Sequence, residues 1–405
     1  MKFYDIAIIG GGASGLAAAI SAANTDSSRS IVLLERLPRI GKKILATGNG
    51  RCNFTNRNID KSCYYGSCSS LSSISADCNI ESFFISLGVY GYADSEGRVY
   101  PLSNAASSVL DGLRLKIADL KNIDVICDFN VKEIKKDKDF TISSDTDSVT
   151  AKAVIAAGGG MSQAALGSDG SVMKMLKSLN IHISPLSPAL TSFKVNPDAV
   201  KALKGIRVNA DVSIYSGTSL LGNEKGEVQF ADNTISGICV FNLSCLCNGK
   251  RDLSLNIDLL PDNNYTEVVA ILSELKRIRS DSMLEDYLSG LFHKRIGIAI
   301  VKSCIDMPLT EKTASLSNKN IKKIAEKIKS WTFTINSLSG FEKSQVTSGG
   351  VIFSEIDIKL RSKKVKGLYM CGELLDITGK CGGYNLDFAF SSGILAGQTC
   401  AEDLK

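Results

Sequence analysis

The sequence contains very little histidine, which limits the chemistry that it can support. His182 and His293 are the only two histidines among its 405 residues. Neither stands at ligand spacing from a second metal-binding side chain, so we expect no bound metal ion. A hydrolase built on a Ser-His-Asp triad also has no support in the rest of the chain.

Long apolar runs and a strong net charge are missing as well. No run of about eighteen apolar residues occurs, so we expect no membrane-spanning helix. The N-terminal apolar stretch has one lysine before it and glycines in its middle, unlike a secretory signal peptide. The net charge of +5 is mild, and no basic stripe with interleaved aromatic residues occurs. We therefore expect a cytoplasmic protein that acts on a small molecule and binds neither nucleic acid nor a membrane.

Paired cysteine motifs are absent although the chain contains twelve cysteines. The lack of a Cys-x-x-Cys pair argues against zinc knuckles and against a disulfide scaffold, so reduced thiols are expected. Cys245 and Cys247 lie in an apolar stretch and are expected in the core. The hydrophobic fraction of 44% and the length predict an ordinary globular protein of two or three domains.

A glycine-rich motif stands near the N-terminus, between an apolar run at residues 5–9 and an Ala-rich stretch at residues 16–23. It reads Gly-x-Gly-x-x-Gly, and its strand–turn–helix setting is the one that dinucleotide binding requires. Gly10 permits the tight turn, Gly12 lets the backbone approach a pyrophosphate, and Gly15 lets the helix pack on the strand. The start of the helix then presents free N–H groups to the phosphates.

A second apolar run, residues 30–34, ends in Glu35, about twenty residues after the motif. An acid at this place binds the ribose hydroxyls of an adenine dinucleotide and favours FAD or NAD over NADP. The alternative is a glycine-rich turn without a ligand. Residues 153–157 form another buried strand that ends in glycines, where the backbone of Ala157 and Gly158 can approach a cofactor. No second complete motif follows, so a nicotinamide cofactor would visit only transiently.

The stretch from residue 36 to residue 56 is rich in Gly, Asn and cations and has too few apolar positions for a regular element. Such a loop can offer N–H, guanidinium and ammonium donors to a phosphate or to flavin carbonyls. The alternative interpretation is a solvated basic loop.

The order of elements predicts a second domain inserted into the dinucleotide-binding domain. We expect a first FAD-binding part at residues 1–188, a β-rich domain at 189–261 with a return strand at 331–345, a helical subdomain at 262–330, and a second FAD-binding part at 346–405. Apolar periodicity predicts helices at residues 79–87, 105–120, 266–278, 283–292, 295–305 and 321–331. Strands are expected at residues 125–127, 130–134 and 331–335, and a surface connection at 62–78.

The closing segment returns to the cofactor. A strand near residue 370 ends in Gly372 and an acid, and a last helix begins after Gly383. An acid there can bind ribityl hydroxyls, and the helix start can stabilise negative charge on a reduced flavin. Gly393 and Gly397 stand four residues apart on this helix and permit close packing, which we expect against the first helix.

Three stretches, residues 41–53, 346–351 and 382–386 with 391–393, carry a resemblance to a known family. They resemble the signature of bacterial FAD-dependent NAD(P)/FAD oxidoreductases that include the bile-acid 3-dehydro-delta(4,6) reductase of gut clostridia and a streptococcal L-aminoacetone oxidase. The resemblance runs from end to end. It implies an α/β fold: a glutathione-reductase-like Rossmann FAD domain with an inserted β-rich domain and a small helical domain.

The resemblance also assigns cofactor-binding residues. Those implied for the ADP half are Gly10, Gly12, Ala13, Ser14, Gly15, Glu35, Arg36 and the backbone of Val131. Those implied for the pyrophosphate and flavin ring are Lys42, Lys43, Gly50, Arg51, Cys52 and Asn53. Those implied for the ribityl chain and isoalloxazine are Gly372, Glu373, Asp376, Gly383, Tyr384, Asn385 and Leu386.

The sequence departs from the family pattern at two places. The last helix carries Asp387, Phe388 and Phe390 where Gln and Trp are usual. The segment at residues 230–238 lacks the usual His and Pro. The loss of His and Pro concerns the substrate and leaves the FAD assignment unchanged.

After metal and hydrolase chemistry are set aside, the expected reaction is hydride transfer at the flavin, with a side chain that protonates or deprotonates the substrate. Arg51, Lys43 and Tyr384 are the catalytic candidates, each with cofactor binding as its alternative role. Cys52, Cys371 and Cys381 fall in segments expected near the flavin, so a redox dithiol is a further alternative.

The resemblance favours a reductase, fed by NADH or NADPH, of an unsaturated carbonyl compound such as a 3-oxo-delta4 or delta4,6 bile-acid intermediate. The alternative is an oxidase of a small amine that releases hydrogen peroxide. A third hypothesis is an FAD-bound protein that binds tRNA or a protein partner, which the mild charge disfavours.

Overall fold

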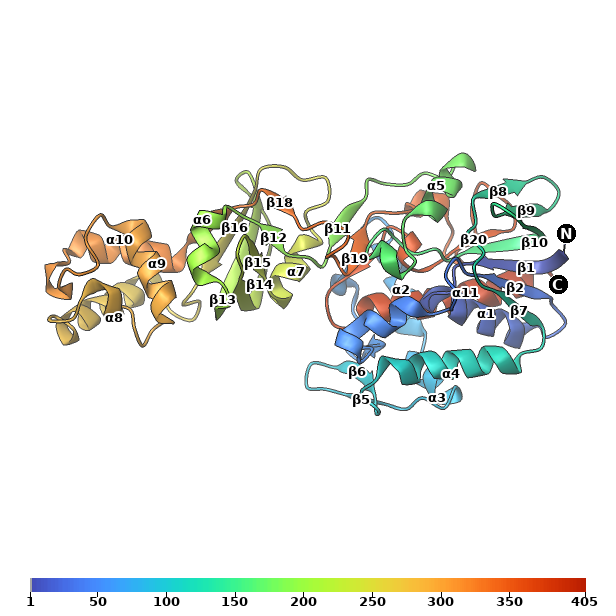
Figure 1. Cartoon of the computed structure of the whole chain (residues 1–405), viewed down its shortest axis with the longest axis horizontal. Coiled ribbons are helices and arrows are strands. Elements are labelled where there is room, and N and C mark those ends of the chain that lie inside the picture. Colours follow the sequence, from blue (N-terminus) through green and yellow to red (C-terminus); the bar gives the residue numbers. More distant parts are fainter. Residues whose placement is uncertain (1) are drawn as a thin grey trace. The chain divides into compact units, whose positions relative to one another are not determined.

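The computed structural model describes residues 2–405 and forms two compact units (Figure 1). One unit contains the chain up to Ala189 together with Phe341–Lys405, and the other contains Leu190–Gly340. The first unit is therefore discontinuous, with the second inserted in sequence between its two parts. The finer division of residues 189–345 into a β-rich domain and a helical subdomain stays a prediction.

A seven-stranded sheet forms the centre of the first unit. Its order is β7-β2-β1-β10-β9-β8, with β20 paired to the end of β10. β7, β2, β1, β10 and β20 are parallel to one another, whereas β9 and β8 add to β10 as an antiparallel hairpin. Burial of the parallel strands on both faces explains their continuous apolar sequences. The bounds are β1 Lys2–Ile9, β2 Ile31–Leu34, β7 Ile123–Ile126, β8 Glu133–Lys136, β9 Phe140–Ser143, β10 Ser148–Ala156 and β20 Leu368–Met370.

The turn between β1 and helix α1 (Ala13–Thr25) has almost no room for side chains. Gly10 has a φ of +109°, which favours glycine. A Cβ on Gly15 would lie 1.8 Å from the carbonyl oxygen of Gly10. The roles predicted for Gly10 and Gly15 are confirmed, since one forms the tight turn and the other brings the helix onto it.

Helix α11 (Tyr384–Asp403) packs on α1 with the two backbones in close approach. A Cβ on Gly393 would lie 2.3 Å from the carbonyl oxygen of Ser14, and one on Gly397 would lie 2.3 Å from that of Ala18. The prediction that these glycines pack the last helix on the first is confirmed. This contact holds the two ends of the chain together.

Further helices and three small sheets complete the described part of the first unit. Its other helices are α2 Ser72–Asp77, α3 Ile80–Ser86, α4 Ala106–Asp119 and α5 Ser171–Ser178. Its small sheets pair β3 (Thr55–Asn56) and β5 (Gly91–Ala93) with β6 (Arg98–Pro101), β4 (Tyr64–Tyr65) with β21 (Thr378–Gly379), and β11 (Ser187–Ala189) with β19 (Val346–Ser348). The prediction that residues 62–78 form a surface connection is wrong, because Cys68, Leu71 and Ser75 are buried.

The second unit contains a seven-stranded antiparallel sheet in the order β17-β16-β13-β14-β15-β12-β18. Ala210, Val212 and Ile214 alternate with more exposed residues along β13, as expected for a sheet with one face in the core. The bounds are β12 Phe193–Lys194, β13 Arg207–Ser216, β14 Ser219–Phe230, β15 Thr234–Ser236, β16 Leu253–Asp258, β17 Trp331–Thr334 and β18 Ser337–Leu338.

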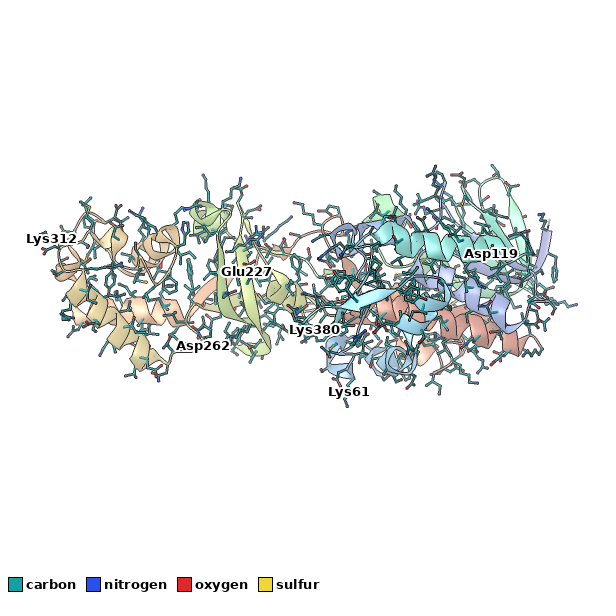
Figure 2. All side chains as sticks on the ribbon, turned by 90° about the horizontal axis from the view of Figure 1, so that it is seen from below. Lys61, Asp119, Glu227, Asp262, Lys312 and Lys380 are labelled. Carbon is teal, nitrogen blue, oxygen red and sulfur yellow. The ribbon has the colours of Figure 1, made fainter. Side chains whose placement is uncertain are left out.

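The helices of the second unit share one hydrophobic cluster with this sheet. They are α6 Pro197–Val200, α7 Ile238–Ser244, α8 Tyr265–Ile278, α9 Lys294–Cys304 and α10 Asn318–Lys329. A capping box of Asn264 and Glu267 begins α8. Asp262, labelled in Figure 2, pairs with Lys225 at 2.6 Å and ties β14 to the segment that leads into α8.

Two predicted elements differ from the structure. Residues 283–292 contain only a short 3-10 turn, Leu284–Asp286, instead of a helix. The backbone N–H groups of Leu284 and Glu285 donate to carbonyl groups at residues 311 and 309, so tertiary hydrogen bonds replace helical ones. The strand expected at residues 130–134 begins only at Glu133, which leaves Val131 in the preceding loop. None of the helices in residues 2–405 is long and apolar enough to cross a membrane.

We expect Gly397→Val to lower the free energy of unfolding by about 1–3 kcal/mol, because its side chain would collide with the α1 backbone. Gln398→Val, on the exposed side of the same helix, is the matched control. Urea unfolding of both variants measures the difference. Equal stability of the two variants would contradict the packing described for α1 and α11.

Candidate cofactor site

The glycine turn at the start of α1 leaves room for a ligand. A Cβ on Gly12 would have no heavy atom within 4 Å, unlike one on Gly10 or Gly15. Gly12 is also the N-cap of α1, and no side chain within the described residues 2–405 caps the free N–H groups of the first turn. A pyrophosphate fits such a helix start through hydrogen bonds and the helix dipole.

The carboxylate of Glu35 lies beside this turn and is 7% exposed. Its two oxygens accept hydrogen bonds from the N–H groups of Gly11 and Leu37, both at 2.8 Å. These bonds fix the carboxylate at the end of β2, while each oxygen keeps capacity for another donor. The arrangement fits a carboxylate that accepts from ribose hydroxyls.

Arg36 and Val131 were both predicted near the ADP half of the cofactor. Arg36 follows Glu35 in the chain, and Val131 lies in the loop before β8. The guanidinium of Arg36 pairs with Asp169, which ties the loop after β2 to the start of α5. Phe129 donates its N–H to the carbonyl of Glu35 and so brings the loop before β8 to the end of β2. Val131 is buried in that loop.

The loop at residues 41–53 forms a 3-10 segment, Lys42–Gly50, with a kink at its end. Gly50 has a φ of +83°, and a Cβ there would meet nothing within 4 Å. Lys42 donates to the carbonyl of Ala165 at 3.1 Å. The exposed Arg51 lies over the ring of Tyr100 at 4.6 Å. The prediction that this stretch contains no regular element is therefore wrong. The alternative of a solvated basic loop is not contradicted, because Lys42, Gly50 and Arg51 are exposed.

Lys43 and Glu373 meet in space although they lie 330 residues apart in the chain. The ammonium group of Lys43 lies 3.0 Å from a carboxylate oxygen of Glu373. The other oxygen accepts from the N–H of Thr347 at 2.9 Å, and the Thr347 hydroxyl accepts from the N–H of Met161 at 2.8 Å. This polar cluster joins the ends of β10 and β20 to β19. Lys43 and Glu373 were predicted site residues, whereas Thr347 was not, although it lies inside the family motif at residues 346–351.

Asn53 and Gly383 also come together. The Oδ1 atom of Asn53 is buried and has no hydrogen-bond partner among residues 2–405. A Cβ on Gly383 would lie 2.7 Å from this atom and 2.5 Å from the carbonyl oxygen of Thr55. A buried acceptor without a donor is costly unless a ligand supplies one, and an N–H group of a flavin is a suitable donor.

Several other residues predicted to bind the ribityl chain and flavin form hydrogen bonds with backbone groups of the protein. Asp376 accepts from the N–H of Ser67 at 3.1 Å. Asn385 bonds with both the N–H and the carbonyl of Gly379 at 2.8 Å. Tyr384 begins α11, and burial raises the pKa of its hydroxyl. The roles of Asp376 and Asn385 toward a cofactor stay predictions.

The cysteines near this site are poorly suited to redox chemistry. Burial raises the pKa of the Cys52 and Cys371 thiols to about 12, so both stay protonated at neutral pH. No disulfide bond joins any two of the twelve cysteines within residues 2–405. A protonated, buried thiol is a weak nucleophile, so the structure favours structural roles for these two residues over a redox dithiol.

FAD therefore fits the residues that the first unit presents. The open backbone at Gly12 would take the pyrophosphate, Glu35 the ribose, and the Asn53 acceptor an N–H group of the flavin. Lys43 would add positive charge, held in place by Glu373. Bound there, FAD supplies hydride transfer.

We expect Gly12→Val to fold normally but to lose FAD, because the new side chain enters open space where the pyrophosphate fits. The expected loss of affinity is at least about 100-fold, or about 2.7 kcal/mol. Flavin absorbance after gel filtration and an FAD titration measure it, with circular dichroism as the folding control. A folded variant that retains full flavin would refute the placement.

Comparisons with known proteins support this fold and FAD as the cofactor. Residues 4–399 match the family described as HI0933-like protein Rossmann domain. The chain is 36% identical to the 3-dehydro-bile acid delta(4,6)-reductase of Clostridium scindens, over 98% of this chain and 99% of that protein. It is 26% identical to the ribosomal RNA dihydrouridine synthase of Escherichia coli, over 100% of this chain and 98% of that protein.

Among solved structures, the 3-ketosteroid-delta4-(5alpha)-dehydrogenase of Rhodococcus jostii RHA1 is similar in fold, with a TM-score of 0.51 and 15% identity. The match covers 99% of this chain and 97% of that one. The predicted α/β Rossmann fold is thus confirmed. The chain belongs to the HI0933-like family of Rossmann-domain proteins and is a flavin-dependent oxidoreductase.

Proposed function

We propose that this protein is an NADH- or NADPH-fed reductase of a carbon–carbon double bond conjugated to a carbonyl group. A 3-oxo-delta4 or delta4,6 bile-acid intermediate is the substrate of first choice. The observation that carries the proposal is the 36% identity to the bile-acid reductase over nearly the whole of both chains. The proposed substrate class includes any compound with a carbon–carbon double bond conjugated to a carbonyl group, and bile-acid intermediates are one example.

Two relatives of different substrate class support this choice of chemistry. Reduction of a 3-oxo-delta4 steroid ring and conversion of uridine to dihydrouridine both add two hydrogens across a double bond next to a carbonyl. A hydride and a proton are the two hydrogens in each case. This common reaction favours a reductase over the small-amine oxidase.

The chain offers a different role for each of the three catalytic candidates. Burial raises the pKa of Tyr384, so its hydroxyl stays protonated and is suited to donate a hydrogen bond to the substrate carbonyl. Arg51 is always charged and can polarise a carbonyl but cannot release a proton. Lys43 is paired with Glu373, which suits it to hold the cofactor. We assign the hydrogen bond to the substrate carbonyl to Tyr384.

No second dinucleotide motif follows the first, so the nicotinamide cofactor is proposed to bind transiently. We expect anaerobic protein loaded with FAD to lose its flavin absorbance on addition of NADH or NADPH. Addition of a 3-oxo-delta4 bile acid should then restore the absorbance. Tyr384→Phe should slow the second step by roughly 10²–10⁴-fold and leave the first within about threefold.

Other outcomes of this experiment separate the alternatives. Reduction by NAD(P)H without reoxidation by any conjugated ketone would reject the substrate class. No reduction by either nucleotide, together with peroxide release from aminoacetone in air, would establish the oxidase instead.

A second candidate is reduction of a uridine in ribosomal RNA. The 26% identity to the E. coli enzyme over the whole chain favours it. Helix α10 also exposes Lys319, Lys322 and Lys323, and none of them forms an ion pair within the part of the chain that the structure describes. Unpaired lysines on one helix can bind phosphates.

If RNA is the substrate, Lys319→Gln with Lys322→Gln should weaken binding of ribosomal RNA and lower the slope of log affinity against log salt by about two. The control removes two exposed lysines of the first unit, Lys121→Gln with Lys138→Gln. Mass spectrometry of the RNA tests for dihydrouridine. Absence of both binding and product would leave the small-molecule substrate.

A further inference from the structure

Asp387 is a buried carboxyl group without a paired cation in the part of the chain that the structure describes. It lies in the first turn of α11 and is 1% exposed. No lysine, arginine or histidine among residues 2–405 forms an ion pair with it. Burial of a carboxylate without a compensating charge is costly, so such a group calls for an explanation beyond packing.

Hydroxyl groups from three elements surround this carboxyl. Thr55 of β3 donates to one oxygen, and Ser391 of α11 donates to the other at 3.2 Å. Ser75 of α2 also bonds to the carboxyl. The titratable groups that face it are the Tyr64 hydroxyl of β4 and the Cys78 thiol that follows α2.

Neither of these two neighbours supplies a compensating charge. Burial raises the pKa of both the Tyr64 hydroxyl and the Cys78 thiol, so both are neutral near pH 7. Burial likewise raises the pKa of Asp387 to about 6, although the hydroxyl donors oppose the shift. The carboxyl therefore changes its charge within the physiological range of pH.

The bond from Thr55 to Asp387 joins two parts of the cofactor site. Thr55 follows Asn53 by two residues, and Gly383 at the start of α11 packs against both of them. Movement of β3 against α11 would displace the unpartnered acceptor of Asn53. The carboxyl thus lies directly behind the contact where the flavin fits.

We propose that Asp387 is a positioning residue that couples FAD binding to the uptake of a proton. FAD brings the negative charges of its pyrophosphate and covers the site, and both effects disfavour a second buried anion. The neutral carboxyl keeps its bonds to Thr55 and Ser391 without that penalty. By linkage, a ligand that favours the protonated form binds more weakly when the proton is lost.

The test is the dissociation constant of FAD from the full chain at pH 5, 6, 7 and 8, measured by quenching of flavin fluorescence without substrate or nucleotide. A shift of one pKa unit on binding weakens the affinity of the natural chain by about tenfold between pH 5 and pH 8. Asp387→Asn should match the natural chain at pH 5, bind about tenfold more tightly at pH 8, and show no such fall.

A merely structural role would give a different result. In that case Asp387→Asn would change the affinity by the same factor at every pH, and parallel profiles would overturn the proposal. Thr55→Val provides a second test that does not alter the carboxyl itself. Loss of this donor should move the midpoint of the pH dependence upward, and an unchanged midpoint would also overturn the proposal.

Failure here is distinguishable from failure of the proposed function. The measurement contains no substrate and no nicotinamide nucleotide. A chain that binds FAD equally well at every pH would reject the role of Asp387 and leave the reductase proposal untouched.

Discussion

The close approach of backbones around α1 is the constraint on which the rest of the first unit depends. Gly15 brings the helix onto the turn at Gly10, and Gly397 brings α11 to within contact of the α1 backbone. Helix α11 lies at the far end of the chain, so the fold cannot form this contact until residues 341–405 return to the first unit. The same contact places the start of α11 where the cofactor fits. Stability therefore depends on Gly15 and Gly397, whereas the room for the cofactor depends on Gly12 in the same turn.

Polar contacts between distant segments then shape the site. Lys43 meets Glu373, and Thr55 meets Asp387, across 330 and 332 residues of chain. Both bonds tie the loop and short strand after β2 to segments near the C-terminus. The two bonds differ in charge, because the first pairs opposite charges and the second leaves a carboxyl among hydroxyl groups. The first supplies a fixed cation beside the site, and the second supplies a group whose charge varies with pH.

Comparison with relatives separates what the family shares from what varies. The Rossmann turn and Glu35 belong to the part that any FAD enzyme of this fold needs. Relatives named for a bile acid and for ribosomal RNA match the same chain from end to end, at 36% and 26% identity. Addition of two hydrogens to a double bond beside a carbonyl is common to both names. We therefore expect the type of reaction to depend on the first unit, and the choice of substrate to depend on residues that differ between these relatives.

The sequence by itself determined the elements that depend on neighbouring residues. The glycine turn, the acid at the end of β2 and the glycines of α11 could be read directly, because backbone conformation and helical spacing are local properties. The helix expected at residues 283–292 was wrong because hydrogen bonds to residues 309–311 outweighed local preference. Only the tertiary structure decided that Asn53 lacks a donor, that Glu373 holds Lys43 and that Asp387 is buried. Burial and contact between segments hundreds of residues apart arise from the whole fold, and no local pattern contains them.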